Sequence, residues 1–555
     1  MLRLLLVAII FLNFCANHKA QNRTVGTITL TEDALEGYTF FSPFSSRSAF
    51  LVDNCGNLIN QWEQGTLPGL SAYFLETGEM LRTYKVDPEG PFISASNAGG
   101  IALVDWNNNT TWSYELNTPT ELSHHDAVMM PNGNILLLTW EIIEADELIE
   151  NGRNPNQIAP QGFAWGERIM EIQPLGTNDI EIVWEWRIKD HWIQDRDSAL
   201  NNFGEIEEHP ELFNINLPDI NSSNSHSSFD YNHFNAIDYH PQYDQILISV
   251  RNSDEIWILD HSTTTEEAAS SIGGNSGMGG DILYRWGNAS AYDAAGIGSQ
   301  RFFGQHGVNW ITDGPDKDKI LVYNNGNGRP GTDFSTVEIL NPPIQSNGIY
   351  EKDVNEPYGP TATDWVYGDG TDPRFYSPFL SNAQYLENGN ILINAGSLGR
   401  IFEISSEKEI VWEYEIPLFG DFVATQGDNI NSNSNFRAYK FPTNFTGFDG
   451  LEIVLGAPIE EEPIPLQICE EINTSTNFLD SKTVQVNSTL DLLQIHNNSI
   501  HTFQVDLFSM NGKLLDEFKS NPGVISKRKN TYTPGVYFLR FSAVNGSQFT
   551  KKVLF

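Results

Sequence analysis

The amino-acid sequence predicts an all-β chain: a six-bladed β-propeller with four-stranded blades, whose ring is closed by N-terminal strands, followed by a small C-terminal β-sandwich. Three observations predict this architecture. The chain has 555 residues, which is enough for one large domain and a small one. It is rich in turn-forming residues, with 45 Gly and 27 Pro, and 12% of its residues are aromatic. Short strand-like segments also recur along it, which is the pattern of a repeat fold.

Four kinds of strand-like segment, named A to D, follow one another along the chain. Each copy is β-branched or aromatic with approximate alternation, which is typical of a strand. Six copies of each kind describe six four-stranded blades. The A segments are 70–75, 124–130, 233–239, 305–311, 380–386 and 435–441, and the B segments are 78–83, 134–140, 245–251, 319–325, 390–395 and 451–456. The C segments are 49–53, 100–105, 168–172, 255–260, 335–339 and 400–404, and the D segments are 57–65, 110–117, 181–188, 281–288, 363–370 and 409–416.

The first and last segments predict how the ring closes. The N-terminal part supplies C and D (49–65) and the C-terminal part supplies A and B (435–456). These four strands are expected to share one blade, which leaves no free edge. Cys55 lies in the turn between this C and D, and Cys469 follows the B segment. We expect a disulfide between them, which would lock the ring over a very long loop; two free thiols are the alternative.

Composition divides the chain into four parts. They are a signal peptide with a short basic start and an apolar run (1–20), the repeats (21–457), an acidic, Pro-containing linker (458–480) and a small β-sandwich with MNG and VNG hairpin turns (481–555). The repeats are interrupted by two polar insertions, 141–166 and 189–230. Long insertions in a propeller lie over one face, so we expect these two to shape the entrance to a pocket.

The charge of the chain excludes some partners. Asp and Glu total 72 against 32 Lys and Arg, which gives a formal net charge of -40. Such a surface repels phosphate backbones and anionic lipid, so we expect neither nucleic acid nor a membrane surface as a partner. A soluble exported protein with a solvated acidic surface fits this composition.

Histidines gather at one position of the repeat. In a propeller the A strands line the channel, and all of them start at one face. Aligning the six A segments places four of the 12 histidines near that mouth: His124, His125, His233 and His306. A single histidine is more often packed in a core or exposed to solvent. Four histidines at related positions, by contrast, predict a site.

Other polar residues join the histidines at this face. Arg251 ends a B segment, and B strands end where A strands start. Asp126 and Asn235 lie one position before the aligned Ala of their A segments. A guanidinium and an amide beside several imidazoles form a receptor for an oxyanion. We therefore predict Asn235, Arg251 and Asp126 as substrate-binding residues.

Three functions are compatible with these residue types. A metal-dependent hydrolase would use the histidines as ligands, although Arg251 would oppose a cation. A binding propeller would hold sulfated or phenolic glycans at the same mouth without turnover. A transferase would use one imidazole as a nucleophile on sulfur or phosphorus, Arg251 and the amides on the oxygens, and a second histidine for the proton. The transferase agrees best with a positively charged Arg251 beside the histidines, and it needs no metal.

Three segments resemble the bacterial aryl sulfotransferase family. They are HHDAVMMPNGNILLLTWE, HFNAIDYHPQYDQILISVR and FGQHGVNWITDGPDKDKILVYNNGNGR, and the resemblance covers most of residues 25–456. It implies a six-bladed propeller that moves a sulfuryl group from an aryl sulfate to a phenol by a ping-pong mechanism. The reaction passes through a sulfohistidine and uses no cofactor and no nucleotide sulfate donor.

The resemblance also implies a role for each site residue. The nucleophile falls on His306 of the QH segment. A supporting histidine and asparagine fall on His233 and Asn235 of HFN, and the arginine falls on Arg251. A further histidine lies in HHD, which leaves His124 and His125 as alternatives.

The last part of the chain resembles a different family. VDLFSMNGKLL, PGVYFLRF and the basic pair before the C-terminus are similar to the C-terminal sorting domain of the type IX secretion system. The resemblance implies that this machinery is a partner. With the signal peptide, it implies a protein that is secreted or attached to the cell surface.

Overall fold

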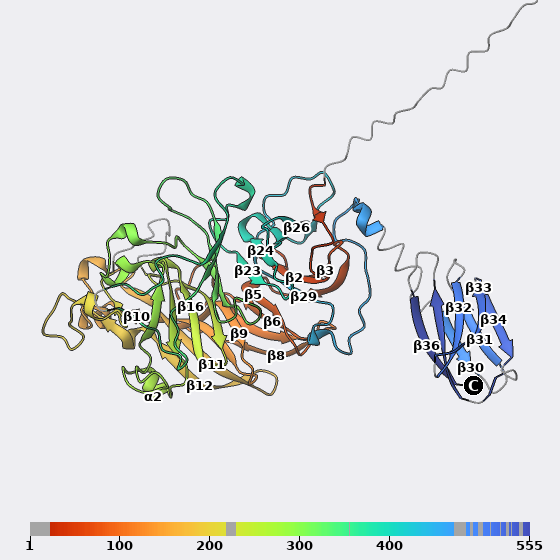
Figure 1. Cartoon of the computed structure of the whole chain (residues 1–555). Helices are drawn as coiled ribbons and strands as arrows, with labels where there is room; N and C mark the ends of the chain where they lie inside the picture. The colour runs from red at the N-terminus through yellow and green to blue at the C-terminus, as the bar shows by residue number, and fades with distance from the viewer. Residues whose placement is uncertain are drawn as a thin grey trace, which may run out of the picture. The chain divides into compact units, whose positions relative to one another are not determined.

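The computed structural model describes residues 23–217, 229–353 and 356–470, and then 484–488, 492–497, 503–510, 512–521, 523–528, 532–533, 535–542 and 548–554. The chain divides into two compact units, residues 1–464 (unit 1) and residues 465–555 (unit 2). Both are built mainly from antiparallel β-sheets (Figure 1). The predicted signal peptide lies outside the described residues, as does part of the predicted linker. No described helix is long and apolar enough to cross a bilayer.

Five sheets of unit 1 are each formed by strands that follow one another in the chain. They are β5 (Pro68–Phe74), β6 (Met80–Lys85), β7 (Gly99–Val104) and β8 (Thr110–Glu115); β9 (Glu121–Met129), β10 (Ile135–Glu144), β11 (Phe163–Leu175) and β12 (Asp179–Arg187); β15 (Phe234–His240), β16 (Gln245–Val250), β17 (Glu255–Asp260) and β18 (Ile282–Trp286); β19 (His306–Trp310), β20 (Ile320–Asn324), β21 (Thr336–Leu340) and β22 (Trp365–Tyr367); and β23 (Asn382–Tyr385), β24 (Ile391–Ala395), β25 (Arg400–Ile404) and β26 (Ile410–Glu415). An extra strand, β1 (Gly26–Leu30), pairs with β26.

A sixth sheet joins the two ends of unit 1. Its order is β29 (Asn435–Pro442), β2 (Gly37–Pro43), β3 (Ser48–Asp53) and β4 (Leu58–Glu63). Figure 1 shows β29 beside β2 and β3, although they are far apart in the sequence. In each sheet the predicted A segment is one edge strand, and the B, C and D segments follow it in order, with one exception.

That exception is the predicted B strand at 451–456, which is wrong: these residues are irregular. Their place between β29 and β3 is taken by β2. Phe41 of β2 is fully buried, whereas Val454 and Leu455 are more than half exposed. A short turn connects β2 to β3, so β2 reaches this position as the first arm of a hairpin. The sixth sheet therefore takes three strands from the N-terminal part and one from the C-terminal part.

The edge strands that carry the A segments contact one another in sequence. The order is β5, β9, β15, β19, β23 and β29, and β29 also contacts β5. Each pair of neighbouring sheets encloses an apolar cluster, because the two facing surfaces exclude water together. Trp257 and Trp412 are fully buried in two of these clusters.

The insertions and connections contain the short elements of unit 1. Residues 141–166 form the extended ends of β10 and β11 around α1, and the described part of 189–230 contains two short parallel strands. The helices are α1 (Ala145–Glu150) and α2 (Thr265–Ala268), and the small strands are β13 (Trp192–Ile193), β14 (Phe213–Asn214), β27 (Leu418–Phe419) and β28 (Phe422–Val423). The 3-10 helices are η1 (Pro155–Gln157), η2 (Ile188–His191), η3 (Ile206–Glu208), η4 (Arg251–Ser253), η5 (Ala289–Tyr292), η6 (Ile297–Ser299), η7 (Pro373–Phe375), η8 (Gly396–Leu398) and η9 (Thr446–Phe448).

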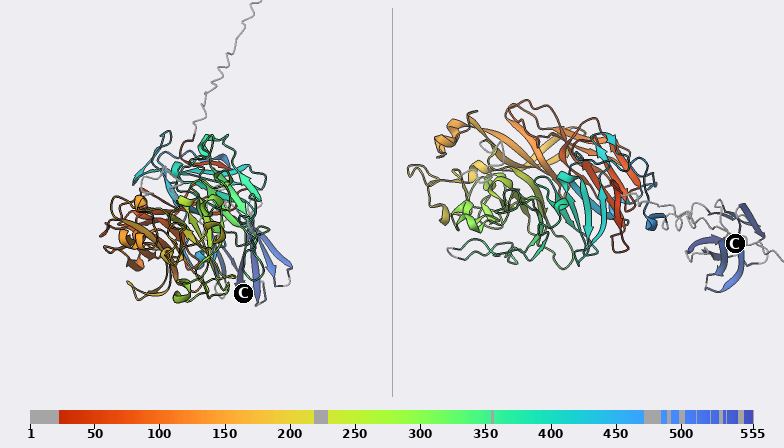
Figure 2. Two further views of the ribbon diagram at one scale, coloured as in Figure 1. Left: turned by 90° about the vertical axis from the view of Figure 1, so that its left-hand side faces the viewer. Right: turned by 90° about the horizontal axis from the view of Figure 1, so that it is seen from above.

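Unit 2 contains two antiparallel sheets. Its strands, coloured blue in Figure 2, form a group of their own. One sheet has β30 (Val484–Ser488), β31 (Leu492–Asn497) and β34 (Gly523–Arg528), and the other has β33 (Leu514–Ser520), β32 (Phe503–Ser509), β35 (Val536–Ser542) and β36 (Gln548–Leu554). Ile495 of the first sheet and Leu507 of the second belong to one apolar cluster, so the two sheets share a core.

Cys55 and Cys469 are disulfide-bonded, which confirms the predicted pair.

A largely buried histidine, His261, links two sheets of unit 1 and predicts a pH dependence of stability. His261 contacts Glu171 through Nε2 (2.9 Å) and Asp244 through Nδ1 (2.6 Å). Burial opposes protonation, but the two carboxylates outweigh it and raise the pKa of His261 to about 9. A folded-state pKa above the unfolded value stabilises the fold fully below the unfolded pKa of about 6.5. This contribution is lost as the pH rises through 9.

We therefore expect the free energy of unfolding to fall between about pH 6.5 and pH 9, and we expect the variant His261→Gln to remove part of that fall. Denaturant unfolding of both proteins across this range measures the difference. Parallel curves for the wild type and the variant would contradict the assignment.

Candidate functional site

Strands of three neighbouring sheets bring the predicted histidines together. His124 and His125 lie in β9, His233 precedes β15, and His306 is the first residue of β19. The rings of His125 and His233 are 4.6 Å apart between centroids. Arg251 opens η4, directly after β16, and its charge acts on His306. The structure therefore gathers all five predicted catalytic residues in one place.

The backbone conformation near the beginning of β9 and β15 sets the direction of these side chains. His125 and His233 have φ angles of 44° and 57°, in the left-handed region that non-glycine residues rarely adopt. The register of β9 against β10 and of β15 against β16 shifts near these points. Such irregularities turn a side chain away from the direction that a regular strand would give it. Strained backbone of this kind concentrates at functional sites.

The hydrogen bonds of His306 define its tautomer. Its Nδ1 lies 2.9 Å from the carbonyl oxygen of Gly304 and 2.8 Å from Oδ1 of Asn325. The Asn325 amide is oriented by its own Nδ2, which donates to the carbonyl oxygens of Ser377 and Leu380. Because both neighbours of Nδ1 are acceptors, Nδ1 must carry the proton. The lone pair therefore lies on Nε2, which has no hydrogen-bond partner among the described residues.

The surroundings of His306 also keep its imidazole neutral. Burial lowers its pKa well below the usual value, and the positive charge of Arg251 lowers the pKa further. A neutral imidazole with a free lone pair is the nucleophilic form. His306 is thus a neutral imidazole whose lone pair lies on Nε2, which is the form that a nucleophile requires.

His233 is paired with a carboxylate. Its Nδ1 contacts Oδ2 of Asp230, which is almost fully buried, and its side chain is 14% exposed. The pair fixes which nitrogen of His233 faces away from the carboxylate, since Nδ1 donates to it. The carbonyl oxygen of His233 also accepts from the backbone N–H of Arg251 at 3.2 Å, so the two residues are held side by side.

The two adjacent histidines of β9 have different environments. His125 faces His233, whereas His124 stacks on Trp140 with ring centroids 4.0 Å apart. His124 is completely buried and contacts Glu167 through Nε2 at 3.0 Å. Of the two alternatives left open by the sequence, His125 is therefore the one beside the other site residues.

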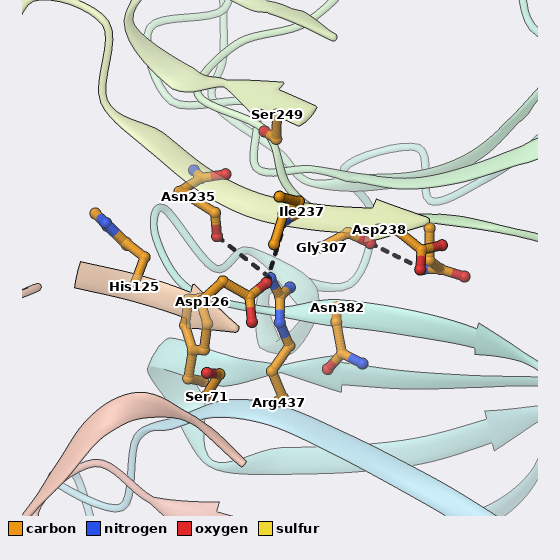
Figure 3. Close-up of polar contacts among 12 residues, drawn as sticks. Ser71, His125, Asp126, Asn235, Ile237, Asp238, Ser249, Gly307, Asn382 and Arg437 are labelled. Carbon is orange, nitrogen blue, oxygen red and sulfur yellow. Dashed lines mark hydrogen bonds and ion pairs between the residues drawn. The ribbon is translucent and has the colours of Figure 1, made fainter. Parts of the chain in front are cut away.

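Asp126 and Asn235 contact protein groups in the centre of the ring of edge strands. Asp126 accepts from the Tyr73 hydroxyl at 2.7 Å, from the Ile237 N–H at 3.3 Å and from Nη2 of Arg437 at 3.0 Å. Figure 3 shows the Arg437 side chain between Asp126 and the backbone of Asn235. The Asn235 amide donates to the carbonyl oxygen of Gln305 at 2.9 Å. Both residues thus orient neighbouring strands.

Four residues of this site were not predicted from the sequence. Arg437 occupies the same position of its A segment as Asp126 and Asn235, so the alignment itself could have identified it. Asn325 directly follows β20, as Arg251 follows β16, and that analogy was available as well. Glu167 and Asp230 carry no signal in the repeat, because Glu167 lies in β11 just before the C segment that begins at 168 and Asp230 lies in the insertion 189–230. Among the described residues, no group of His, Cys, Asp and Glu has the arrangement of a metal site.

The comparisons with known proteins give a family match and weak structural likenesses. The model of the family Arylsulfotransferase (ASST) matches residues 41–418, which is more than half of the chain. A search of curated proteins found no match. A protein of unknown function from Bacteroides caccae is 10% identical, with a TM-score of 0.40 and coverage of 73% of this chain and 99% of that one. Virginiamycin B lyase from Staphylococcus aureus is 13% identical, with a TM-score of 0.31 and coverage of 71% and 89%. These structural likenesses are too weak to establish fold or activity.

The ion pair between Asp126 and Arg437 predicts a strong coupling. Replacing Arg437 with Met leaves a buried carboxylate without its cation, which we expect to cost about 3–5 kcal/mol of unfolding free energy. The double variant Asp126→Asn with Arg437→Met removes both charges, so we expect it to recover much of that loss. Denaturant unfolding of the two single variants and the double variant measures the coupling. Additive losses would contradict the assigned ion pair.

Proposed function

The chain belongs to the arylsulfotransferase (ASST) family, and from this premise we propose that it moves a sulfuryl group from an aryl sulfate to a phenol by a ping-pong mechanism. The observation that carries the proposal is the hydrogen bonding of His306. Two acceptors hold its Nδ1–H and leave the Nε2 lone pair available. The family match covers the strands that carry this histidine and its neighbours.

In the first half-reaction, Nε2 of His306 attacks the sulfur of the donor. The N–S bond forms, the bond from sulfur to the aryl oxygen breaks, and its electron pair leaves with the aryl oxygen. The positive charge that the ring acquires is shared through Nδ1–H with Asn325 and the carbonyl oxygen of Gly304. Arg251 and the second amide hydrogen of Asn235 bind the sulfuryl oxygens, because charge-assisted hydrogen bonds stabilise the anionic transition state.

In the second half-reaction, the oxygen of the acceptor phenol attacks the same sulfur. The N–S bond breaks, and its electron pair returns to Nε2 of His306. The phenol loses its proton to a histidine of the site. His125 and His233 are the candidates, because their rings lie against each other beside His306. General-base help of this kind contributes about 10²–10⁴-fold to a rate.

The proposed function includes an architecture and a location. We propose that the six four- and five-stranded sheets of unit 1 are the blades of a closed six-bladed propeller; the cyclic contacts of the edge strands, from β5 through β29 and back, support this. We also propose that the protein is exported, and that unit 2 is a sorting domain for type IX secretion. The sequence of the N-terminal segment and the segments VDLFSMNGKLL and PGVYFLRF support this location.

The test is turnover of a chromogenic aryl sulfate in the presence of a phenol. We expect the purified protein to release the coloured phenolate and to form the new aryl sulfate without added nucleotide or metal. His306→Asn removes the nucleophile, so its rate should fall by a factor on the order of 10⁴.

His240→Asn is the matched control. His240 lies in β15 at the end away from the histidine site and contacts Asp318. We expect this variant to keep the wild-type rate. A wild-type protein that is folded but releases no phenolate would sink the proposed function, and so would an active His306→Asn.

A further inference from the structure

We propose that Glu167, His124 and His125 form a buried relay that stores the phenolic proton between the two half-reactions. In this arrangement, Nε2 of His125 exchanges the proton with the substrate, and Glu167 holds it. The inference rests on the proposed sulfuryl transfer. It assigns the proton chemistry of that reaction to three residues, joined by two hydrogen bonds, in the sheet formed by β9, β10, β11 and β12.

The relay is a continuous line of hydrogen bonds. Oε2 of Glu167 lies 3.0 Å from Nε2 of His124, and Nδ1 of His124 lies 2.8 Å from Nδ1 of His125. Because Nδ1 of His125 faces His124, its Nε2 is on the opposite side of the ring, and it has no hydrogen-bond partner among the described residues. The ring of His125 packs against that of His233 in the site. The line therefore runs from a buried carboxyl group to the reacting centre.

The inner end of the relay is held in a defined orientation. Oε1 of Glu167 accepts from the backbone N–H of Phe234 at 2.8 Å, so only Oε2 is available to His124. His124 is fixed by its stacking on Trp140. Glu167 and His124 are completely buried, so water has no direct access to the stored proton.

The electrostatics agree with storage on the carboxyl group. Burial raises the pKa of Glu167 well above its usual value, and the nearby Asp230 raises it further. Burial lowers the pKa of His124 to about 3, and it also lowers the pKa of His125. Both imidazoles are thus neutral, and the proton rests on Glu167.

In the resting enzyme the relay is an acid. Protonated Glu167 donates to Nε2 of His124, Nδ1–H of His124 donates to Nδ1 of His125, and Nε2–H of His125 points toward the substrate. When the donor's aryl oxygen leaves sulfur, it takes this proton. One proton shifts along each hydrogen bond, and Glu167 becomes a carboxylate. The released product is a neutral phenol, and the sulfuryl group is on His306.

In the second half-reaction the relay is a base. The acceptor's O–H gives its proton to Nε2 of His125 as the oxygen attacks sulfur. The shifts reverse, and Glu167 is protonated again. The cycle conserves protons: the proton of the acceptor replaces the one that left with the donor's phenol. No co-reactant is needed.

The variant Glu167→Gln tests the relay. The Phe234 N–H requires an oxygen at the Oε1 position, so the amide NH₂ of the Gln must face His124. That NH₂ only donates, which locks the relay in its acid form. Release of a phenolate that needs no protonation should continue as a burst of one per enzyme. Transfer to a phenol that is neutral at the assay pH should fall by a factor on the order of 10² or more.

An acceptor that is ionised at the assay pH separates proton chemistry from structural damage. It brings no proton, so the variant should transfer to it at nearly the wild-type rate. Equal losses for neutral and ionised acceptors would overturn the relay, as would no loss for either. Glu171→Gln is the matched control, because Glu171 lies on the same strand and contacts His261 instead. It should leave both rates unchanged.

A second measurement uses the wild-type protein and does not depend on the folding of a variant. Infrared difference spectra between the resting and the sulfated enzyme should show the loss of one protonated carboxyl group when the donor releases a neutral phenol. Spectra without that loss would overturn the relay. Neither result is confused with failure of the proposed function, which would show as no phenolate release and no sulfated enzyme in the wild type.

Discussion

The guanidinium group of Arg437 connects the strands that carry the site. From β29 it reaches Asp126 of β9, the backbone of Asn235 in β15 and the carbonyl oxygen of Ser381, which directly precedes β23. A buried cation with such contacts is stable only when all of its partners keep their positions. Because β9 and β15 position His125 and His233, the geometry of the histidine site depends on this contact. The pairing of β29 with β2 holds Arg437 in turn, since it ties the last strand of unit 1 to the first ones.

Burial gives the histidines of the site their chemistry. In water an imidazole is partly protonated near neutral pH, and the protonated form has no lone pair to attack with. Here burial keeps His306, His125 and His124 neutral, and Arg251 adds to the effect at His306. Burial has the opposite consequence for the carboxyl group of Glu167, which it keeps protonated. The same exclusion of water thus accounts for both properties that the proposals need, a neutral imidazole at His306 and a protonated carboxyl group at Glu167.

The repeat in the sequence was enough to predict most strands of the large sheets of unit 1 and the proximity of the four histidines. The A segments share a pattern of alternating residues, and their alignment placed His124, His125, His233 and His306 together. It did not predict β2, because the apolar residues of 451–456 fit the repeat as well as those of β2 do. Nothing in the sequence shows which of the two segments pairs with β29. It did not predict Glu167, because a residue that acts through long-range hydrogen bonds has no fixed place in a repeat. The choice between His124 and His125 also required the structure, because it depends on a left-handed backbone at His125.

The most direct test of this account is the location of the sulfuryl group in the half-reacted enzyme. Brief incubation of the protein with an aryl sulfate and no acceptor, followed by an acid-free quench, proteolysis and mass spectrometry, identifies the modified residue. The account predicts one sulfuryl group, on His306, which disappears when a phenol is added before the quench. A sulfuryl group on another residue, or turnover in which no sulfated protein forms, would contradict it.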